Sequence, residues 1–228
     1  MSAVVTCGMP DEARVLTAAL RPGTLIFSGT DKLNLPKLIP ASTTRLLCMG
    51  VCGGLLPPFE VGNTVLADTV VDYAGTLAFA DPAWNAKAVA AAARHRIAAT
   101  VVPYYSSGIM DEANTAGQRA RLSARYSSKP AAIDDETRYV VAQAKAMNVP
   151  FNVIRPLSDD YSETLPLSAT GAIMNKDGSA DIGYLLWSLG QNQGPGAVNL
   201  FTVAMDYKKS LDALEAIAAA LSDLIAKG

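Results

Sequence analysis

Short apolar segments rich in β-branched residues recur along the chain, each bounded by glycine, proline or polar residues. Apolar runs of this length are typical of strands that are buried on both faces of a sheet. They predict strands at residues 2–7, 24–28, 44–49, 63–70, 99–105 and 150–155. Between these runs, the pattern is helical over residues 11–20, 83–96, 135–147 and 207–227. Strands that alternate with helices predict an α/β fold with a central, largely parallel sheet covered on both faces.

Two segments interrupt this alternation. Residues 159–181 are polar and contain a Lys-Asp-Gly turn, and residues 190–196 (GQNQGPG) indicate a loop. We place no domain boundary in either segment. A chain of 228 residues, 50% of them hydrophobic, can bury one large core, so we expect a single domain over residues 1–228. The first segment follows a strand end, where open α/β sheets bind their ligands, and it is therefore a candidate part of a site.

Charge and cysteine content exclude several classes of function. The formal net charge is -2 and the 19 Lys and Arg residues form no basic run, so a nucleic-acid partner is not expected. The three cysteines form no CxxC pair, and two lie in apolar runs, which favours reduced thiols in the cytoplasm. The N-terminus shows no signal-peptide pattern, and no apolar stretch reaches the about 20 residues that span a bilayer. We therefore expect a cytoplasmic protein without a transmembrane segment.

A glycine-rich turn follows one of the predicted strands. It runs from Met49 to Gly54 (MGVCGG), and it is neither a Walker loop, because no lysine follows, nor a GxGxxG motif. Adjacent glycines such as Gly53 and Gly54 let the backbone approach a ligand closely, so a sugar or an anion could rest here. A tight structural turn is the alternative.

Acidic residues cluster near the start of two predicted helices. Asp11 and Glu12 follow the first strand; Asp11 suits a helix cap, which leaves Glu12 for another role. The run Asp134-Asp135-Glu136 either caps the next helix or faces a ligand with hydroxyl groups. The second reading is chemically sound because one carboxylate can accept hydrogen bonds from both hydroxyls of a ribose.

A third acidic run, Ser158-Asp159-Asp160, follows the strand at 150–155. An acid in a partly dry crevice can hold a proton near neutral pH and deliver it to a leaving group. An Asx-turn or a helix cap is the alternative. Taken together, three strand ends with carboxylates and one with glycines describe a crevice that can activate water and protonate a departing base. His95, the only histidine, lies between two arginines and is expected on the surface.

Four segments of the chain match the motifs of a known family in the same order. They are CGMPDEA, MGVCGGLLPPFEVGNTVLAD, SSGIMDE and AIDDETRYVVAQAKAMNVPFNVIRPLSDD. Over nearly its whole length the chain resembles the nucleoside phosphorylases and nucleosidases of the purine nucleoside phosphorylase fold. The run SDDYSETLPLSATGAIMNKDGSADI and the short length are most similar to the hopanoid-associated subgroup, whose members are thought to release adenine from adenosylhopane. The resemblance implies a three-layer α/β/α fold with a central mixed, largely parallel sheet.

The resemblance also implies roles for individual residues. Glu136 would hold the ribose hydroxyls, Asp159 would protonate the departing purine near N7, and Glu12 would orient or deprotonate the attacking water. The other substrate-binding residues would be Val51, Gly53, Gly54, Asp135 and Ser158. An enzyme of this kind needs no metal and no organic cofactor, and uses water or inorganic phosphate as co-substrate.

The sequence departs from the family pattern in three places. Asp135 stands where members usually carry a methionine packed on the sugar, and Val51 stands where the hydrolases often have a serine. The arginine that phosphorylases place just before the glycine turn is absent. With so few anion contacts, hydrolysis is favoured over phosphorolysis, although Arg14 or Arg155 could compensate.

The expected partner is a small purine nucleoside, which in the hopanoid-associated subgroup is lipid-linked. A methylthioadenosine or adenosylhomocysteine nucleosidase and a phosphate-dependent purine nucleoside phosphorylase are the alternative enzymes. A nucleoside-binding protein that has lost catalysis is the alternative outside enzymes. Relatives often assemble as dimers or hexamers, so the resemblance also implies a homo-oligomer.

Overall fold

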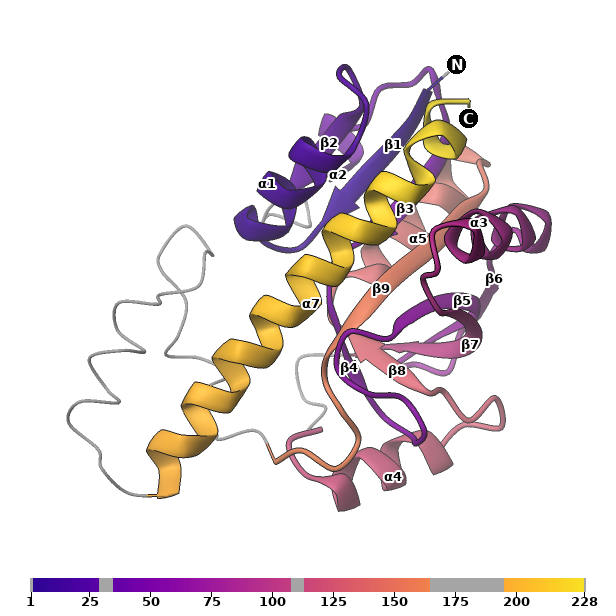
Figure 1. Cartoon of the computed structure of the whole chain (residues 1–228). Coiled ribbons are helices and arrows are strands. Elements are labelled where there is room, and N and C mark those ends of the chain that lie inside the picture. Colours follow the sequence, from indigo (N-terminus) through magenta and orange to yellow (C-terminus); the bar gives the residue numbers. More distant parts are fainter. Residues whose placement is uncertain (1, 29–34, 108–112, 165–194, 228) are drawn as a thin grey trace.

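A computed structural model of the chain describes residues 2–28, 35–107, 113–164 and 195–227 (Figure 1). Most of the polar segment 159–181, the first part of the loop predicted at 190–196 and part of the SSGIMDE motif lie outside the described residues. Strands and helices otherwise alternate along the chain, as the apolar pattern predicts.

The six predicted strands are all present, with boundaries within four residues of the expected ones. They are β1 (Ser2–Cys7), β2 (Leu25–Ser28), β3 (Thr43–Met49), β5 (Thr64–Asp72), β7 (Ala99–Ser106) and β9 (Phe151–Asp159). The apolar pattern did not reveal three short strands, β4 (Cys52–Gly54), β6 (Leu77–Phe79) and β8 (Ala132–Asp134), although a short strand before the acidic run at Asp134 was expected. Three residues are too few to show a period, which is why the apolar pattern did not reveal them.

Within the described residues the strands form one mixed sheet in the order β2-β1-β3-β9-β4-β8-β7-β5-β6. Six of the neighbouring pairs are parallel, and the pairs β4–β8, β5–β6 and β5–β9 are antiparallel. Because β9 pairs with β5 as well as with β4, the strands β9, β4, β8, β7 and β5 close into a ring. The parallel strands β1, β3 and β9 end at the same edge of the sheet, and β9 extends past β3 to run beside β4.

Helices cover both faces of the sheet, so the predicted three-layer α/β/α arrangement is confirmed. The helices α1 (Pro10–Ala19), α3 (Pro82–Arg94) and α7 (Pro195–Ala226) lie together on one face, where α7 crosses in front of β9 (Figure 1). On the other face, α5 (Thr137–Met147) packs on β3 and β9 and is joined by the short α2 (Leu35–Leu38). Two buried apolar clusters fill the two interfaces, one with side chains of α1, α3 and α7 and the other with side chains of α5.

Two helical segments differ from the expectation. Helix α7 begins at Pro195, well before the predicted start at 207, so the last two residues of the loop predicted at 190–196 are helical. Helix α4 (Ala116–Ala124) was not predicted at all, although a capping box of Thr115 and Gln118 marks its start. It lies at the end of the molecule beyond the strand ends of β4 and β8 (Figure 1).

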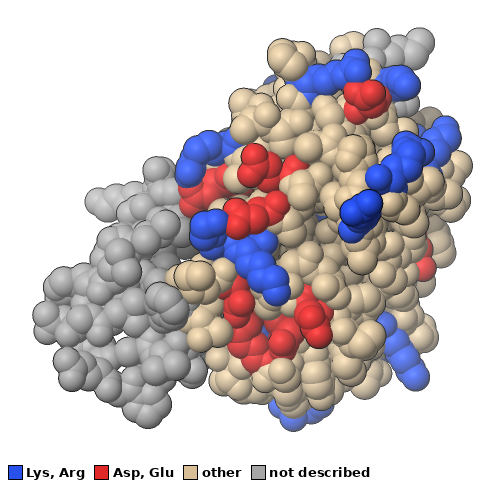
Figure 2. All heavy atoms as spheres, viewed as in Figure 1, with Lys and Arg blue, Asp and Glu red and all other residues tan. Residues whose placement is uncertain are grey.

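The surface carries no concentrated charge on the face seen in Figure 2. Acidic and basic side chains form small neighbouring groups there, separated by uncharged areas. This mixed pattern agrees with the near-neutral net charge of -2. In the part of the chain that the structure describes, no helix is long and apolar enough to cross a membrane.

Candidate functional site

Glu12 lies in the first turn of α1, directly after the end of β1, and its side chain is buried, with 1% of the residue exposed. Its Oε2 accepts hydrogen bonds from the backbone N–H groups of Gly8 and Met9, at 2.8 and 2.9 Å. Its Oε1 accepts a third from the backbone N–H of Val51, at 2.7 Å. Glu12 therefore ties the end of β1 to the turn after β3, and it also caps α1. The sequence assigned that cap to Asp11, and this was wrong.

Burial raises the pKa of Glu12 to about 7, against the opposing effect of the Arg155 guanidinium. Desolvation dominates because the carboxylate has lost its contact with water, which disfavours the charged form. A carboxyl group with this pKa exchanges its proton near neutral pH. It is therefore suited to accept a proton from a bound water.

Arg155, from the middle of β9, is the cation at the centre of the site, and it is also 1% exposed. Its Nε lies 2.8 Å from Oδ2 of Asp134, and its Nη2 lies 3.2 Å from Oε2 of Glu136. Its Nη1 donates to the carbonyl of Val51 at 2.7 Å, and Nη2 also faces the Cys48 sulfur at 3.1 Å. All three guanidinium nitrogens are thus engaged by the protein. The sequence left Arg155 open as an anion contact, but its nitrogens are occupied here.

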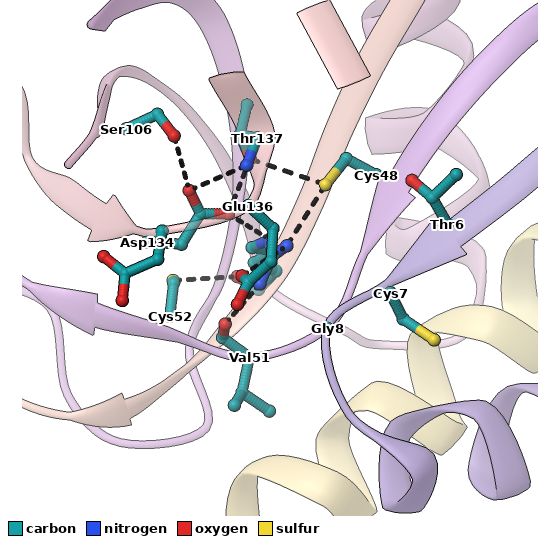
Figure 3. A network of polar contacts seen from close by, with 12 residues as sticks. Thr6, Cys7, Gly8, Cys48, Val51, Cys52, Ser106, Asp134, Glu136 and Thr137 are labelled. Carbon is teal, nitrogen blue, oxygen red and sulfur yellow. Dashed lines mark hydrogen bonds and ion pairs between the residues drawn. The ribbon is translucent and has the colours of Figure 1, made fainter. Parts of the chain in front are cut away.

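The three consecutive acids at the start of α5 have three different environments. Asp134 is buried; its Oδ1 accepts from the backbone N–H of Thr137 at 3.2 Å, and its Oδ2 accepts from the Thr137 hydroxyl at 2.6 Å (Figure 3). Asp135 is exposed and accepts a hydrogen bond from the hydroxyl of Ser107. Glu136 is partly exposed and points back toward the end of β1. Capping of α5, one of the two interpretations of this run, falls on Asp134, and ligand binding by Glu136 stays a prediction.

Asp159 closes β9 and is buried, with 8% of the residue exposed. Its Oδ2 lies 2.6 Å from Nη2 of Arg119, which reaches it from α4. Its Oδ1 lies 2.8 Å from the hydroxyl of Ser158, and this hydroxyl is also 3.1 Å from the carbonyl of Cys52. Burial raises the pKa of Asp159, whereas the Arg119 cation opposes the rise. The group is thus an acid whose proton affinity is set by two competing effects.

Each of the three candidate carboxylates packs against a glycine. A Cβ atom at Gly50 would lie 2.6 Å from Oε1 of Glu12, one at Gly8 would lie 2.7 Å from Oε1 of Glu136, and one at Gly53 would lie 2.9 Å from Oδ2 of Asp159. Side-chain carbons do not approach other atoms so closely, so only glycine leaves room for these carboxylates. Gly50 belongs to the turn between β3 and β4, and Gly53 belongs to β4 itself.

The structure brings Glu12 and Glu136 together beside Arg155, and it places Asp159 against β4 at Gly53. The turn that follows β3 holds Glu12 through its backbone N–H and Arg155 through its backbone carbonyl, both at Val51. Figure 3 shows Val51 beside Glu136, with the Gly8 turn on the neighbouring strand end. Gly54, the last residue of β4, packs tightly against Leu157 of β9 instead of facing a carboxylate. Contact of these turn residues with a ligand stays a prediction, but their part in building the site is visible.

Sequence reasoning missed three residues that shape this site and gave a fourth a different role. Gly8 and Gly50 were not singled out because their role depends on carboxylates far away in the sequence. Arg155 was considered only as an anion contact, and Arg119 was not considered. A sequence signal for Arg119 did exist, because the Thr115–Gln118 capping box predicts the helix that carries it.

Solved structures of nucleosidases are similar to this chain. The 5′-methylthioadenosine/S-adenosylhomocysteine nucleosidase from Neisseria meningitidis is 13% identical, with a TM-score of 0.69 over 97% of this chain and 99% of that chain. The corresponding nucleosidase of Helicobacter pylori is 14% identical, with a TM-score of 0.67 over 99% and 97%. This chain shares their fold. Futalosine hydrolase of Helicobacter pylori is similar at 15% identity, with a TM-score of 0.62 over 93% and 97%. No protein-family model and no curated protein matches the sequence.

Proposed function

We propose that the protein hydrolyses the N-glycosidic bond of an adenine nucleoside and releases the free base. The observation that carries the proposal is the close packing of Glu12, Glu136 and Asp159 against Gly50, Gly8 and Gly53, which lie directly after β3, directly after β1 and within β4. The fold supports it, because the similar solved structures are of nucleosidases, one of them in complex with methylthio-immucillin-A. Fold alone would not carry the proposal, since one fold hosts many activities.

Each carboxylate has a distinct part in the proposed reaction. Glu12 accepts a proton from water as the water oxygen forms its bond to C1′ of the ribose. Asp159 donates its proton to N7 of the adenine as the bond from C1′ to N9 breaks. Glu136 accepts hydrogen bonds from the ribose hydroxyls, and its negative charge stabilises the positive charge that develops on the sugar. The two protons then return through solvent, so Glu12 and Asp159 regain their starting states.

The positions of the arginines favour water over phosphate as the attacking group. Arg155 is held by Asp134, Glu136 and two further groups, and Arg119 is held by Asp159. Arg14 is largely exposed and pairs with the neighbouring Asp11. A phosphate needs cationic or N–H donors that are not already engaged. We therefore propose hydrolysis, without a metal or an organic cofactor, and keep phosphorolysis as the alternative.

The 5′ substituent of the nucleoside is a finer part of the proposal. The resemblance to the hopanoid-associated subgroup favours a lipid-linked nucleoside such as adenosylhopane, and the solved neighbours favour methylthioadenosine or adenosylhomocysteine. Asp135 bears on the choice because an exposed carboxylate stands where the family has methionine. We also propose that the protein lies in the reducing cytoplasm, in keeping with three buried cysteines that form no disulfide. From the resemblance, we propose that it is a homo-oligomer.

One assay tests the reaction and its alternatives together. The protein is incubated with adenosine, methylthioadenosine, adenosylhomocysteine and a lipid-linked adenosine, with and without phosphate, and free adenine is measured. We expect adenine release that does not require phosphate. Strict dependence on phosphate would replace hydrolysis by phosphorolysis, and tight binding without base release would favour a non-catalytic nucleoside-binding protein.

Variants at two adjacent positions sharpen this assay. Glu136→Gln removes the charge that the proposal places beside the ribose, so kcat/KM should fall by about 10-fold or more. Asp135→Met is the companion change one residue away: it introduces the methionine usual in the resembling family, and so it tests whether Asp135 takes part in seating the ribose. Base release that is insensitive to Glu136→Gln would contradict the proposed role of this carboxylate.

A further inference from the structure

Arg119 is a buried cation that sequence analysis did not connect with the site. It lies on α4, and 1% of the residue is exposed. Its Nε donates to the carbonyl of Ala113 at 2.8 Å, and its Nη1 donates to the carbonyl of Gly54 at 3.0 Å and closely to that of Asp160. The remaining nitrogen, Nη2, contacts Oδ2 of Asp159. The guanidinium thus joins α4, β4 and the end of β9 in one set of contacts.

The other charged groups near Asp159 are acidic. Asp160 follows it in the chain, and Glu163 lies in the segment after β9. Burial, together with the neighbouring charges of Asp159 and of Asp206 from α7, raises the pKa of Glu163 to about 7. From β4, the buried Cys52 thiol also faces Asp159. Among the described residues, Arg119 is the cation that offsets these charges at Asp159.

The two oxygens of Asp159 are held differently. Oδ2 lies 2.6 Å from the positively charged Nη2 of Arg119, so a proton on this oxygen would be repelled. Oδ1 faces the Ser158 hydroxyl, which has a second acceptor, the carbonyl of Cys52, 3.1 Å away. A hydroxyl donates one hydrogen bond at a time, so Ser158 can turn to Cys52 when Oδ1 carries a proton. The contacts therefore leave Oδ1 as the oxygen that can be protonated.

We propose that Arg119 is a positioning residue that fixes the direction and the proton affinity of Asp159, with Oδ1 as the oxygen that gives up the proton. This inference rests on the proposed function, in which Asp159 protonates the departing base. Arg119 acts through Asp159 and does not touch the substrate. Its four contacts explain why an arginine is required, because the planar fork reaches several acceptors at once whereas an ammonium group cannot.

The test compares three variants of α4. Arg119→Gln removes the charge but keeps a group that can donate to the carbonyl oxygens, and Arg119→Lys keeps the charge without the fork. Arg121→Met is the matched control, because Arg121 is an exposed arginine on the same helix. For each variant, kcat and KM for adenosine are measured as a function of pH, and folding is checked by circular dichroism.

We expect the alkaline limb of the pH profile to move upward by about one pH unit or more in Arg119→Gln, because an adjacent cation lowers a carboxyl pKa by this amount. Arg119→Lys should keep the limb near its original position but lower kcat, and Arg121→Met should change neither. An unshifted limb in folded Arg119→Gln would overturn the inference. If Arg119→Gln does not fold, Arg119→Lys carries the test, and an unchanged kcat in that variant would overturn it.

A measurement that needs no substrate separates this inference from the proposed function. Carboxyl carbons of aspartate are labelled with carbon-13 and titrated by NMR, and the Asp159 resonance is assigned with Asp159→Asn. The pKa of Asp159 should be higher in Arg119→Gln than in the unmodified protein. Failure to release adenine would refute the proposed function, whereas an unmoved Asp159 titration in Arg119→Gln would refute only the role of Arg119.

Discussion

The close contact between the Glu12 carboxylate and Gly50 predicts that Gly50→Ala lowers both the stability and the activity of the protein. The new Cβ would lie 2.6 Å from Oε1 of Glu12, so the carboxylate must retreat until the contact is between 3.0 and 3.4 Å, a displacement of about 0.4–0.8 Å. The bond from the Val51 N–H to Oε1 is only 2.7 Å long, and it would be stretched or lost. A hydrogen bond to a buried charged group contributes about 1.5–3 kcal/mol, so we expect a loss of stability of this size.

The same displacement should reduce catalysis. Misplacing a reacting group by about 1 Å can cost about 100-fold in rate, so we expect a fall in kcat of about 10- to 100-fold in Gly50→Ala. The expected loss of stability corresponds to a fall in Tm of about 3–12 °C in a protein of this size. Both values are measured on the same preparation, Tm by calorimetry and kcat by adenine release, and the rate is referred to folded protein.

Gly75→Ala is the matched control for this experiment. Gly75 has a φ of +81°, so an alanine there is strained, but no atom lies within 4 Å of the Cβ position. This change should cost about 1–2 kcal/mol of stability without altering kcat. Gly50→Ala is not strained in this way, because the backbone at Gly50 lies outside the left-handed region. Retention of both the Tm and the kcat of the unmodified protein in Gly50→Ala would refute the arrangement of Glu12 described above.

Three further outcomes are expected. Asp159→Asn should lower base release by about 10²–10⁴-fold per folded molecule, and unchanged turnover would place the general acid elsewhere. Activity should be lost as pH falls through about 7, because burial raises the pKa of Glu12 to about 7 and only its charged form accepts a proton from water. A kcat/KM that stays constant across neutral pH would argue against Glu12 as the base. Arg155→Met should destabilise the protein by about 3–5 kcal/mol in urea unfolding, because Asp134 and Glu136 lose their shared cation, and an unchanged midpoint would show that this buried network stabilises nothing.

Much of the fold could be predicted from local pattern. The strands β1, β3 and β9, most of β5 and the second half of β7 are largely buried, so their sequences contain apolar runs that stand out along the chain. Helix α3 could also be predicted from local pattern, because alanines lie on its buried face and Asp81 caps its start. The short strands β4 and β8 do not show in the apolar pattern, because their residues are extended only through pairing with each other and with β9 and β7.

The acidic residues of the site could also be predicted in part. Glu12, Glu136 and Asp159 follow or precede buried strands, and the ends of parallel strands meet at one edge of a sheet. Their individual roles came from resemblance to a family and not from spacing. Asp11 was assigned the cap of α1 because acidic residues suit a helix start, but the structure gives this position to Glu12, whose side chain reaches the N–H of Met9.

The sequence by itself determined where the chain is extended or helical, and which strand ends carry carboxylates, because both follow from residue type over a few neighbouring positions. The tertiary structure decided which charges meet: Arg155 with Asp134 and Glu136, and Arg119 with Asp159. These partners are brought together by the order in which β3, β9 and β4 pair, and no local pattern encodes that order. Burial decided the proton affinity of the acidic residues. A carboxyl group such as Glu12 reaches a pKa near 7 only after folding has removed it from water.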